Sequence, residues 1–261
     1  MKTSTSKRLR WNVAIWLAAG LFMTSTSGMA AGPIMPDPKA EARHQPQIEE
    51  TANGIPLVNI TAPSSGGVSR NEYETFNVPD KGAILNNSYT LSKTELAGYV
   101  QGNNNMAERP AKIIVNEVTG AGSTSMDGFL EVAGNRADVV IANPNGITVN
   151  GGGFINTGKA FLTTGKPVYD GEDHLQRFDI TGGDILIEGK GLGGKETGSL
   201  AILSRAVRIN AGIWAKDLHI TTGANTVDAK TLEASAIEGK GERPAFALDT
   251  AAIGGMYAGR I

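Results

Sequence analysis

Three histidines and one pair of acids are the side chains best suited to hold a metal ion. His44, His174 and His219 stand far apart, and their neighbours lack the ligand spacing that zinc requires, so we predict solvated surface positions for all three. Glu172 and Asp173 lie in a glycine-bounded segment, where carboxylates suit a weak Ca²⁺ site, although a solvated turn is far more common. The sequence therefore predicts no metal site, no cofactor and no catalytic group.

Two glycine motifs approach the patterns that bind nucleotides. The segment GFINTGKA, residues 153–160, resembles a phosphate-binding loop, but alanine follows the lysine in place of the Ser or Thr that holds Mg²⁺. A G-x-G-x-x-G pattern is followed by period-two alternation instead of the helix that a pyrophosphate needs. We interpret this second motif as a wide turn, with its glycines at Gly189, Gly191 and Gly194.

The segment NPNGITVNGGGFINT, residues 143–157, is rich in residues that shape the backbone and has no acid, base or thiol. Asn143-Pro144-Asn145-Gly146 is predicted to form a turn, because proline fixes one φ and Asn or Gly supplies a positive one. An apolar strand at 138–142 should precede this turn, and a second strand should begin at Ile147. From these residues alone the segment is a well-formed corner.

The first 30 residues have the pattern of an export signal. Four basic residues precede an apolar stretch at 11–23, and the small-x-small segment 28–30 predicts cleavage after Ala30. The apolar stretch is short for a bilayer span, so we predict an exported chain, with a membrane anchor at 11–23 as the alternative.

Charge and cysteine content limit the partners of the mature chain. Removal of the signal lowers the 24 basic residues to 20 and leaves the 26 acidic residues, which gives a net charge of −6. Nucleic acid is therefore not a predicted partner, because phosphate binding needs a clustered positive field. The chain has no cysteine, so an exported domain must be stabilised by its own core.

The rest of the chain is predicted to be all-β. Residues 31–52 carry Pro and charge without a period and are expected to form a flexible leader, whereas short apolar segments with period-two alternation recur from residue 55 onward. An antiparallel sandwich and a β-solenoid both fit this rhythm. The solenoid is favoured because asparagine tolerates left-handed backbone and forms ladders between stacked strands. The asparagines beside strand segments are Asn143, Asn145, Asn150, Asn156, Asn210 and Asn225.

One segment, residues 91–100, carries conflicting signals. Ser92 and Glu95 have the spacing of a capping box, which predicts one or two helical turns from this point. Tyr99 and Val100 suit a strand equally well.

The order of several segments resembles the secretion domain of two-partner-secretion (TPS) exoproteins, the filamentous haemagglutinin, haemolysin and contact-dependent inhibition family. The resemblance covers residues 53–261 and includes N-P-N-G-I at Asn143 to Ile147. It implies a right-handed parallel β-helix with an N-terminal cap and small extra-helical strands. It also implies that the periplasmic modules of an outer-membrane TpsB-type barrel transporter recognise the domain. The segments that carry it are NGIPLVNITAPSSGGVSRNEYETFNV, GAILNNS, KIIVNEV, EVAGNRADVVIANPNGITVNGGGFINT, LTTGKP, IEGKGL, AGIWAKDL and GGMYAGRI.

The sequence departs from the family pattern at two places. A second family signature, N-P-N-L, is replaced here by Asn103-Asn104-Asn105-Met106, and loss of the proline is expected to loosen that turn. Many relatives carry two cysteines where this chain has Val149 and Gly152. The final segment, GGMYAGRI, stops within an expected strand, so we expect an uncapped coil and a truncated member of the family.

The leading hypothesis is a secretion domain without enzymatic activity. It would enter the periplasm through the Sec machinery and reach the surface or surroundings of a Gram-negative bacterium, where the full exoprotein would act as adhesin, haemolysin or toxin on host or neighbouring cells. Two alternatives stay open. The first is a β-helix enzyme that acts on polysaccharide, and the second is a glycan-binding module that uses Trp214 and Tyr257, although both rings suit packing between coils equally well.

Overall fold

The computed structural model describes residues 32–107, 109–194, 197–250 and 254–261. The predicted signal segment and its cleavage point at Ala30 lie outside the described residues. Nearly all the regular structure is β-strand, and the described residues contain no α-helix with the length and hydropathy of a membrane span.

Three parallel sheets, here called faces 1, 2 and 3, surround one core. Face 1 contains β3 (Pro56–Asn59), β5 (Ala83–Asn87), β10 (Phe129–Gly134), β13 (Gly152–Ile155), β18 (Leu192–Gly194) and β25 (Gly255–Arg260). Face 2 contains β4 (Val68–Phe76), β8 (Ile113–Val118), β11 (Ala137–Ala142), β14 (Thr157–Thr163) and β19 (Ser199–Ser204). Face 3 contains β9 (Thr124–Met126), β12 (Ile147–Val149), β17 (Asp184–Ile187), β20 (Ala206–Ile209) and β24 (Leu248–Thr250). One long strand, β21 (Gly212–Thr222), pairs in both face 1 and face 2.

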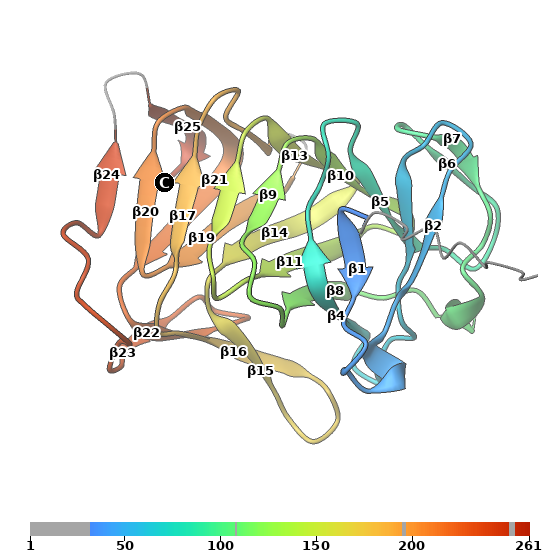
Figure 1. Cartoon of the computed structure of the whole chain (residues 1–261), viewed down its shortest axis with the longest axis horizontal. Coiled ribbons are helices and arrows are strands. Elements are labelled where there is room, and N and C mark those ends of the chain that lie inside the picture. The colour runs from blue at the N-terminus through green and yellow to red at the C-terminus, as the bar shows by residue number, and fades with distance from the viewer. Residues whose placement is uncertain (1–31, 108, 195–196, 251–253) are drawn as a thin grey trace, which may run out of the picture. The chain divides into compact units, whose positions relative to one another are not determined.

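The chain visits the three faces in turn and then returns to face 1 one coil further on, as Figure 1 shows. Thus β10, β11 and β12 make one coil, and β13, β14 and β17 make the next. The pairings between these successive coils are parallel, which is the arrangement of a solenoid and not of a sandwich. The predicted parallel β-helix is therefore confirmed.

Alternation along each strand separates two apolar layers. In β11, Val139 and Ile141 belong to the main core inside the coils. Val140 and Ala142 point the other way and belong to a second buried cluster on the outside of face 2. This double burial explains the continuous apolar run of β11, because a strand with both faces covered has no polar side.

A small antiparallel sheet covers the outside of face 2. It contains β15 (Lys166–Tyr169), β16 (Leu175–Ile180), β22 (Asn225–Asp228) and β23 (Ala234–Ala236), and Figure 1 shows β15 and β16 projecting below the coils. Phe178 of β16 packs on Phe161 of β14 with ring centroids 5.8 Å apart. The extra-helical strands implied by the family resemblance are therefore present.

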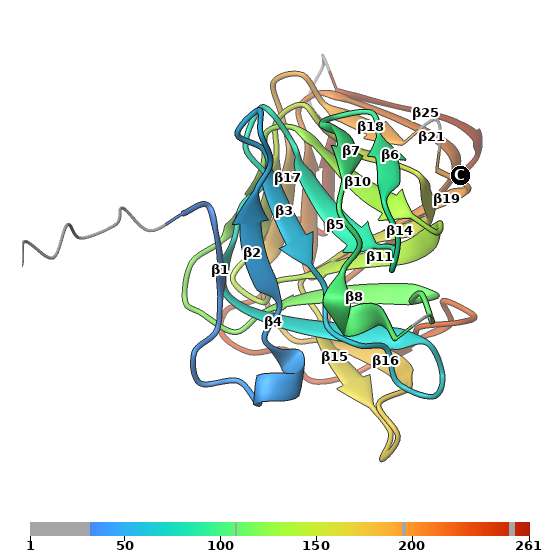
Figure 2. The same ribbon diagram turned by 90° about the vertical axis from the view of Figure 1, so that its right-hand side faces the viewer.

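The N-terminal segment differs from the prediction of a flexible leader at 31–52. Strand β1 (Ile34–Pro36) pairs antiparallel with β4, and β2 (Gln47–Glu50) pairs antiparallel with β3, with the short 3-10 helix η1 (Ala42–His44) between them. Figure 2 shows β1 and β2 beside the first coil. These strands close two sheet edges that the first coil would otherwise leave unpaired. The Pro-rich composition gave no sign of these strands, because they form by pairing with strands that are distant in the sequence.

The segment 91–100 is a β-hairpin and not the predicted helical turn. Strand β6 (Ser92–Thr94) pairs antiparallel with β7 (Gly98–Val100). The carboxylate of Glu131, on β10, accepts hydrogen bonds from the backbone N–H groups of Glu95 (2.7 Å) and Leu96 (2.9 Å). A helix would need a local cap for these N–H groups, and here a distant side chain binds them instead.

Candidate functional site

The segment Asn143 to Ile147 turns the chain from β11 on face 2 to β12 on face 3. Gly146 N donates to Asn143 O at 3.1 Å, which closes a β-turn with Pro144 at the position that favours proline. Asn145 N donates to Asn143 Oδ1 at 2.9 Å, so the asparagine side chain holds the turn from within. Gly146 has a φ of 111°, where a side chain would be strained. Pro144 and Asn145 are exposed, whereas Asn143 is fully buried.

The two asparagines of this turn also bind the preceding coil. Asn143 Nδ2 donates to Gly122 O and to Thr124 Oγ1, both at 3.0 Å. Asn145 Nδ2 donates to Gly120 O at 2.8 Å. The turn therefore fastens its own coil to the corner of the coil formed before it.

The following coil packs closely against the same turn. A Cβ atom at Gly183 would lie 2.5 Å from the carbonyl oxygen of Pro144, and Gly183 has a φ of 74°. Only glycine fits both the close contact and the positive φ at position 183. The turn therefore has close backbone neighbours in the coils on both sides.

The second motif, Asn103 to Met106, repeats this hydrogen-bond pattern. Met106 N donates to Asn103 O at 3.1 Å, and Asn105 N donates to Asn103 Oδ1 at 2.9 Å. Asn103 Nδ2 and Asn105 Nδ2 both donate to Ile60 O of the preceding coil, at 2.9 and 3.1 Å. The last three residues form the 3-10 helix η2 (Asn104–Met106), and the Met106 side chain is buried in the main core.

The second turn keeps this hydrogen-bond pattern without a proline, and the expected loosening of its backbone stays a prediction. In both motifs the first and third residues are asparagines, and their side chains make the bonds that define the turn and its contact with the previous coil. The second residue differs, being Pro144 in one motif and Asn104 in the other. Asn-x-Asn is the structural unit, and proline adds only backbone stiffness.

Other corner asparagines reach the backbone of a neighbouring coil in a similar way. Asn156, with a φ of 54°, donates to Val132 O (2.8 Å) and Gly134 O (3.1 Å). A side-chain ladder of the predicted kind occurs where Asn86 Nδ2 donates to Asn59 Oδ1 at 2.8 Å, in register on β5 and β3. Corner asparagines therefore bind carbonyl oxygens as well as one another.

The structure corrects the prediction that His44 is a surface residue. His44 belongs to η1 of the N-terminal cap; its ring is buried, and Nδ1 lies 2.9 Å from Glu72 Oε1. Arg70 Nη2 lies 2.9 Å from the same oxygen and 3.5 Å from Glu117 Oε2. Sequence reasoning missed this cluster because its members come from η1, β4 and β8; the alternation of Arg70 and Glu72 was the one available signal.

Burial shifts two pKa values in this cluster in opposite directions. It raises the pKa of Glu117 to about 7, and the nearby Arg70 guanidinium only partly offsets this effect. It lowers the pKa of His44, and the positive charge of Arg70 lowers it further. A neutral His44 and a neutral Glu117 leave Arg70 paired with Glu72 alone.

The remaining candidate residues occupy structural positions. His174 lies in the β15–β16 loop beside Asp170, with Nδ1 2.9 Å from its carboxylate, and His219 lies on β21. Asp173 pairs with Arg43 at 2.7 Å. Within the ranges that the structure describes, no group of three or more His, Asp or Glu side chains has the arrangement of a metal site.

The two glycine motifs and the two aromatic residues also have structural surroundings. Residues 152–163 run as β13 and β14, and the G-x-G-x-x-G segment leads through β18 into the strand β19 instead of a helix. Trp214 and Tyr257 are in register on β21 and β25, and their rings stack with centroids 6.0 Å apart and planes 12° apart. The rings therefore stack on each other across neighbouring coils, while Tyr257 stays 60% exposed, so glycan binding by this pair stays an alternative.

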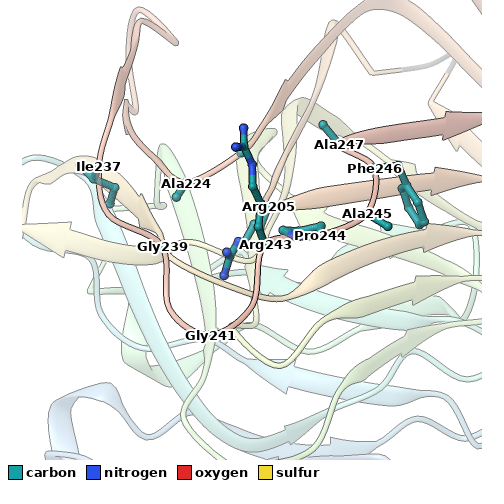
Figure 3. A pocket seen from close by; sticks show the side chains of 11 residues that line it. Arg205, Ala224, Ile237, Gly239, Gly241, Arg243, Pro244, Ala245, Phe246 and Ala247 are labelled. Atoms are coloured by element: carbon teal, nitrogen blue, oxygen red, sulfur yellow. The ribbon is translucent and has the colours of Figure 1, made fainter.

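A cavity of about 790 Å³ lies near the loop 237–247, and two arginines line it. Figure 3 shows the Arg205 and Arg243 side chains pointing in different directions. Arg205 donates to the carbonyl oxygens of Thr181 (3.2 Å) and Lys240, which fixes the loop beside the small sheet. The guanidinium groups thus do not converge on one anion.

Comparison with known proteins places these turns in a family. The family model described as the TPS secretion domain matches residues 33–261, which include both asparagine turns and the N-terminal cap. The chain belongs to the TPS secretion domain family. This family implies an outer-membrane TpsB-type transporter as partner, and its exoproteins are exported to the surface or surroundings of Gram-negative bacteria.

Relatives and a solved structure agree with the family. The chain is 48% identical to "16S rRNA endonuclease CdiA" of Enterobacter cloacae over 82% of its length, and 46% identical to "Toxin CdiA" of Yersinia pestis over 94%. It spans only 6% and 7% of those two proteins. The crystal structure of the filamentous haemagglutinin secretion domain matches with a TM-score of 0.78 and 32% identity, covering 86% of this chain and 76% of that one.

Proposed function

We propose that the Asn143–Ile147 turn and the strand before it are the part of this TPS secretion domain that the transporter's periplasmic modules recognise. The turn presents exposed Pro144 and Asn145 at a corner, while Asn143 holds their backbone in place. The bonds from Asn145 N and Gly146 N to Asn143 lie within four residues, so the turn can form before the coils stack, and its two outward residues support a recognition role. The corresponding turn at Asn103 to Met106 is proposed as a second, weaker contact.

The strand before the turn is expected to contact the transporter only before it folds. In the folded domain both edges of β11 are paired, with β8 and β14, and both of its faces are buried. Addition of β11 to a sheet edge of the transporter requires free backbone N–H and C=O groups. We therefore propose that the unfolded chain is recognised in the periplasm, and that stacking of coils outside the cell then removes the strand from the transporter.

A binding experiment with matched variants tests the role of the turn. Asn145→Ala removes an exposed turn residue, and Asn156→Ala removes an exposed corner asparagine that also binds the preceding coil but lies outside the motif. When both chains are diluted freshly from urea, purified periplasmic modules should capture the Asn145→Ala chain more weakly than the Asn156→Ala chain. Equal capture would leave the turn with a structural role alone.

A second measurement tests recognition before folding. The modules should capture chain diluted freshly from urea and should capture prefolded chain much less. Equal capture of both forms would contradict the role of β11, because its edges are paired only in the folded domain.

We further propose that residues 1–30 are removed after Ala30 following Sec-dependent export, and that the domain itself catalyses no reaction. Three acids of the described ranges have a raised pKa, and each has a structural partner: Glu117 faces Arg70, Glu131 binds the β6–β7 hairpin, and Asp138 accepts from the backbone of Lys159. The nuclease and toxin activities named for the relatives would then reside outside the 6–7% that this chain matches. The full exoprotein would meet host or neighbouring cells through those other regions.

A further inference from the structure

The β15–β16 hairpin is attached to the coils at two polar points in addition to its apolar face. The ring of Tyr169, on β15, lies under the Arg70 guanidinium with 4.4 Å between the guanidinium carbon and the ring centroid. Asp173, in the hairpin loop, pairs with Arg43 of the N-terminal cap at 2.7 Å and lies 4.0 Å from His44 Nε2. The hairpin therefore joins the cap to face 2.

Glu117 lies beneath this attachment and is poorly paired for a charged group. Its side chain is 5% exposed, and the nearest cation, Arg70 Nη2, is 3.5 Å from Oε2. The same guanidinium nitrogen is 2.9 Å from Glu72 Oε1, so two carboxylates compete for one cation. Among the described residues, Glu117 Oε2 and the hydroxyl of Tyr169 are buried atoms without a hydrogen-bond partner. A buried carboxylate with these neighbours is much better tolerated when it is protonated.

We propose that the contact between the β15–β16 hairpin and face 2 is a pH-sensitive latch, closed while Glu117 carries a proton and loosened when Glu117 ionises. Ionised Glu117 needs water, and Glu117 follows Val115 by two residues on β8, which places it on the outer side of face 2 that the small sheet covers. Movement of Tyr169 away from Arg70 would hydrate Glu117 and expose the apolar cluster on the outside of face 2. No covalent change is involved.

Several charged groups surround the latch and set its pH range. Arg70 and Lys166 add a positive field that favours ionised Glu117, whereas Glu72 opposes it. His44 acts in the opposite pH direction, because its pKa is lowered and the closed cluster therefore resists its protonation in acid. The latch should thus be tightest at mildly acidic pH, where His44 is neutral and Glu117 still carries its proton in the closed state.

The hairpin loop carries the other charged groups that face this region. Asp173 pairs with Arg43 of the cap, and Asp170 lies against His174, with Glu172 more distant. The charged groups that act on the Glu117 carboxyl are Arg70, Glu72 and Lys166, so the loop acids attach the loop and do not set the pH range of the latch.

Thiol labelling can measure the latch because the chain has no cysteine of its own. Ala201→Cys places a thiol in the cluster beneath the small sheet, where Ala201 is 2% exposed. Ala160→Cys places a thiol in the main core, which becomes accessible only when the coils themselves unfold. Labelling rates are divided by those of an unstructured cysteine peptide at the same pH, which corrects for the thiolate fraction.

The proposal predicts a pH-dependent difference between wild-type and Glu117→Gln backgrounds, each carrying Ala201→Cys. The pKa of Glu117 is about 7 in the closed state and takes its ordinary value in the open state. Between pH 6 and pH 9 the opening constant measured by this thiol should therefore rise about tenfold more in the wild-type background than in Glu117→Gln. Because both backgrounds keep His44, its contribution cancels. Glu172→Gln, which removes an acid that is 74% exposed from the same hairpin, should behave as wild type.

Two outcomes would overturn the latch. The first is the same pH dependence with and without Glu117. The second is equal labelling rates for the Ala201→Cys and Ala160→Cys variants, which would mean that the small sheet opens only when the whole domain unfolds. If Ala201→Cys fails to fold, Ala142→Cys reports on the same cluster and replaces it.

Discussion

Replacement of Asn143 by alanine tests whether the side chain, and not the proline, holds the recognition turn. The substitution removes two donated hydrogen bonds, to Gly122 O and Thr124 Oγ1, and the two that Asn143 Oδ1 accepts from Asn145 N and Nδ2. Water can replace the lost partner at Gly122 and Asn145, which are exposed, but not at Thr124, which is 1% exposed. An unsatisfied buried group costs about 1–3 kcal/mol, and each solvated bond costs up to about 1 kcal/mol. We expect Asn143→Ala to lower the free energy of unfolding by roughly 2–4 kcal/mol.

Urea unfolding of residues 31–261, followed by tryptophan fluorescence, measures this loss, because Trp214 is the only tryptophan after the predicted signal segment. Asn145→Ala and Pro144→Ala serve as controls, since both positions are exposed and each change should cost less than about 1 kcal/mol. A loss for Asn143→Ala below about 0.5 kcal/mol, or no larger than that of Asn145→Ala, would refute the reasoning.

Three other substitutions test the second turn, the buried acid and a tight glycine corner. Asn104→Pro should stabilise the domain by about 0.4–1 kcal/mol, because position 104 begins a 3-10 helix after an extended residue. Asn105→Pro should destabilise the domain, because the Asn105 N–H donates a hydrogen bond, and urea midpoints compare the two variants. Because its pKa is raised, Glu117 contributes stability that is fully present below its ordinary pKa of 4.5 and is lost as pH rises through about 7. Glu117→Gln should therefore raise the free energy of unfolding by up to about 3 kcal/mol at about pH 8.5 and change it little near pH 4.5 in the same assay. Gly191→Ala, with a φ of 79° and a Cβ 2.1 Å from a backbone oxygen of the next coil, should lower the thermal midpoint strongly, while Gly182→Ala, with open space around it, should not.

The coils could be predicted from sequence because each strand carries its own alternation. In β20, Val207 and Ile209 are buried and Arg208 is exposed, as the period-two pattern requires. Parallel in-register stacking then follows from the asparagine and glycine residues at the breaks. Information of this kind is local, and it repeats in every coil.

The cap, the β6–β7 hairpin and the His44 cluster could not be predicted because partners distant in sequence form them. Ser92 and Glu95 have the spacing of a capping box, yet the Glu95 N–H that Ser92 would bind in such a box donates to Glu131 instead. The residues next to His44 gave no sign of its burial. Its partner Glu72 lies far away in the sequence, on β4, which pairs with β1 of the cap. The hydrogen bonds of the second asparagine motif were not foreseen because asparagine side chains accept them in both motifs, whereas proline is the most visible residue of the family signature.

The continuous strand β21 has a consequence for how the domain comes apart. In the earlier coils a break separates the face 1 strand from the face 2 strand, whereas β21 runs through both faces and pairs with β18, β19 and β25. Loss of strand pairing on one face should therefore disrupt the pairing on the other face. This coil should unfold as one cooperative unit. An intermediate that has lost only one face should be rarest at this coil.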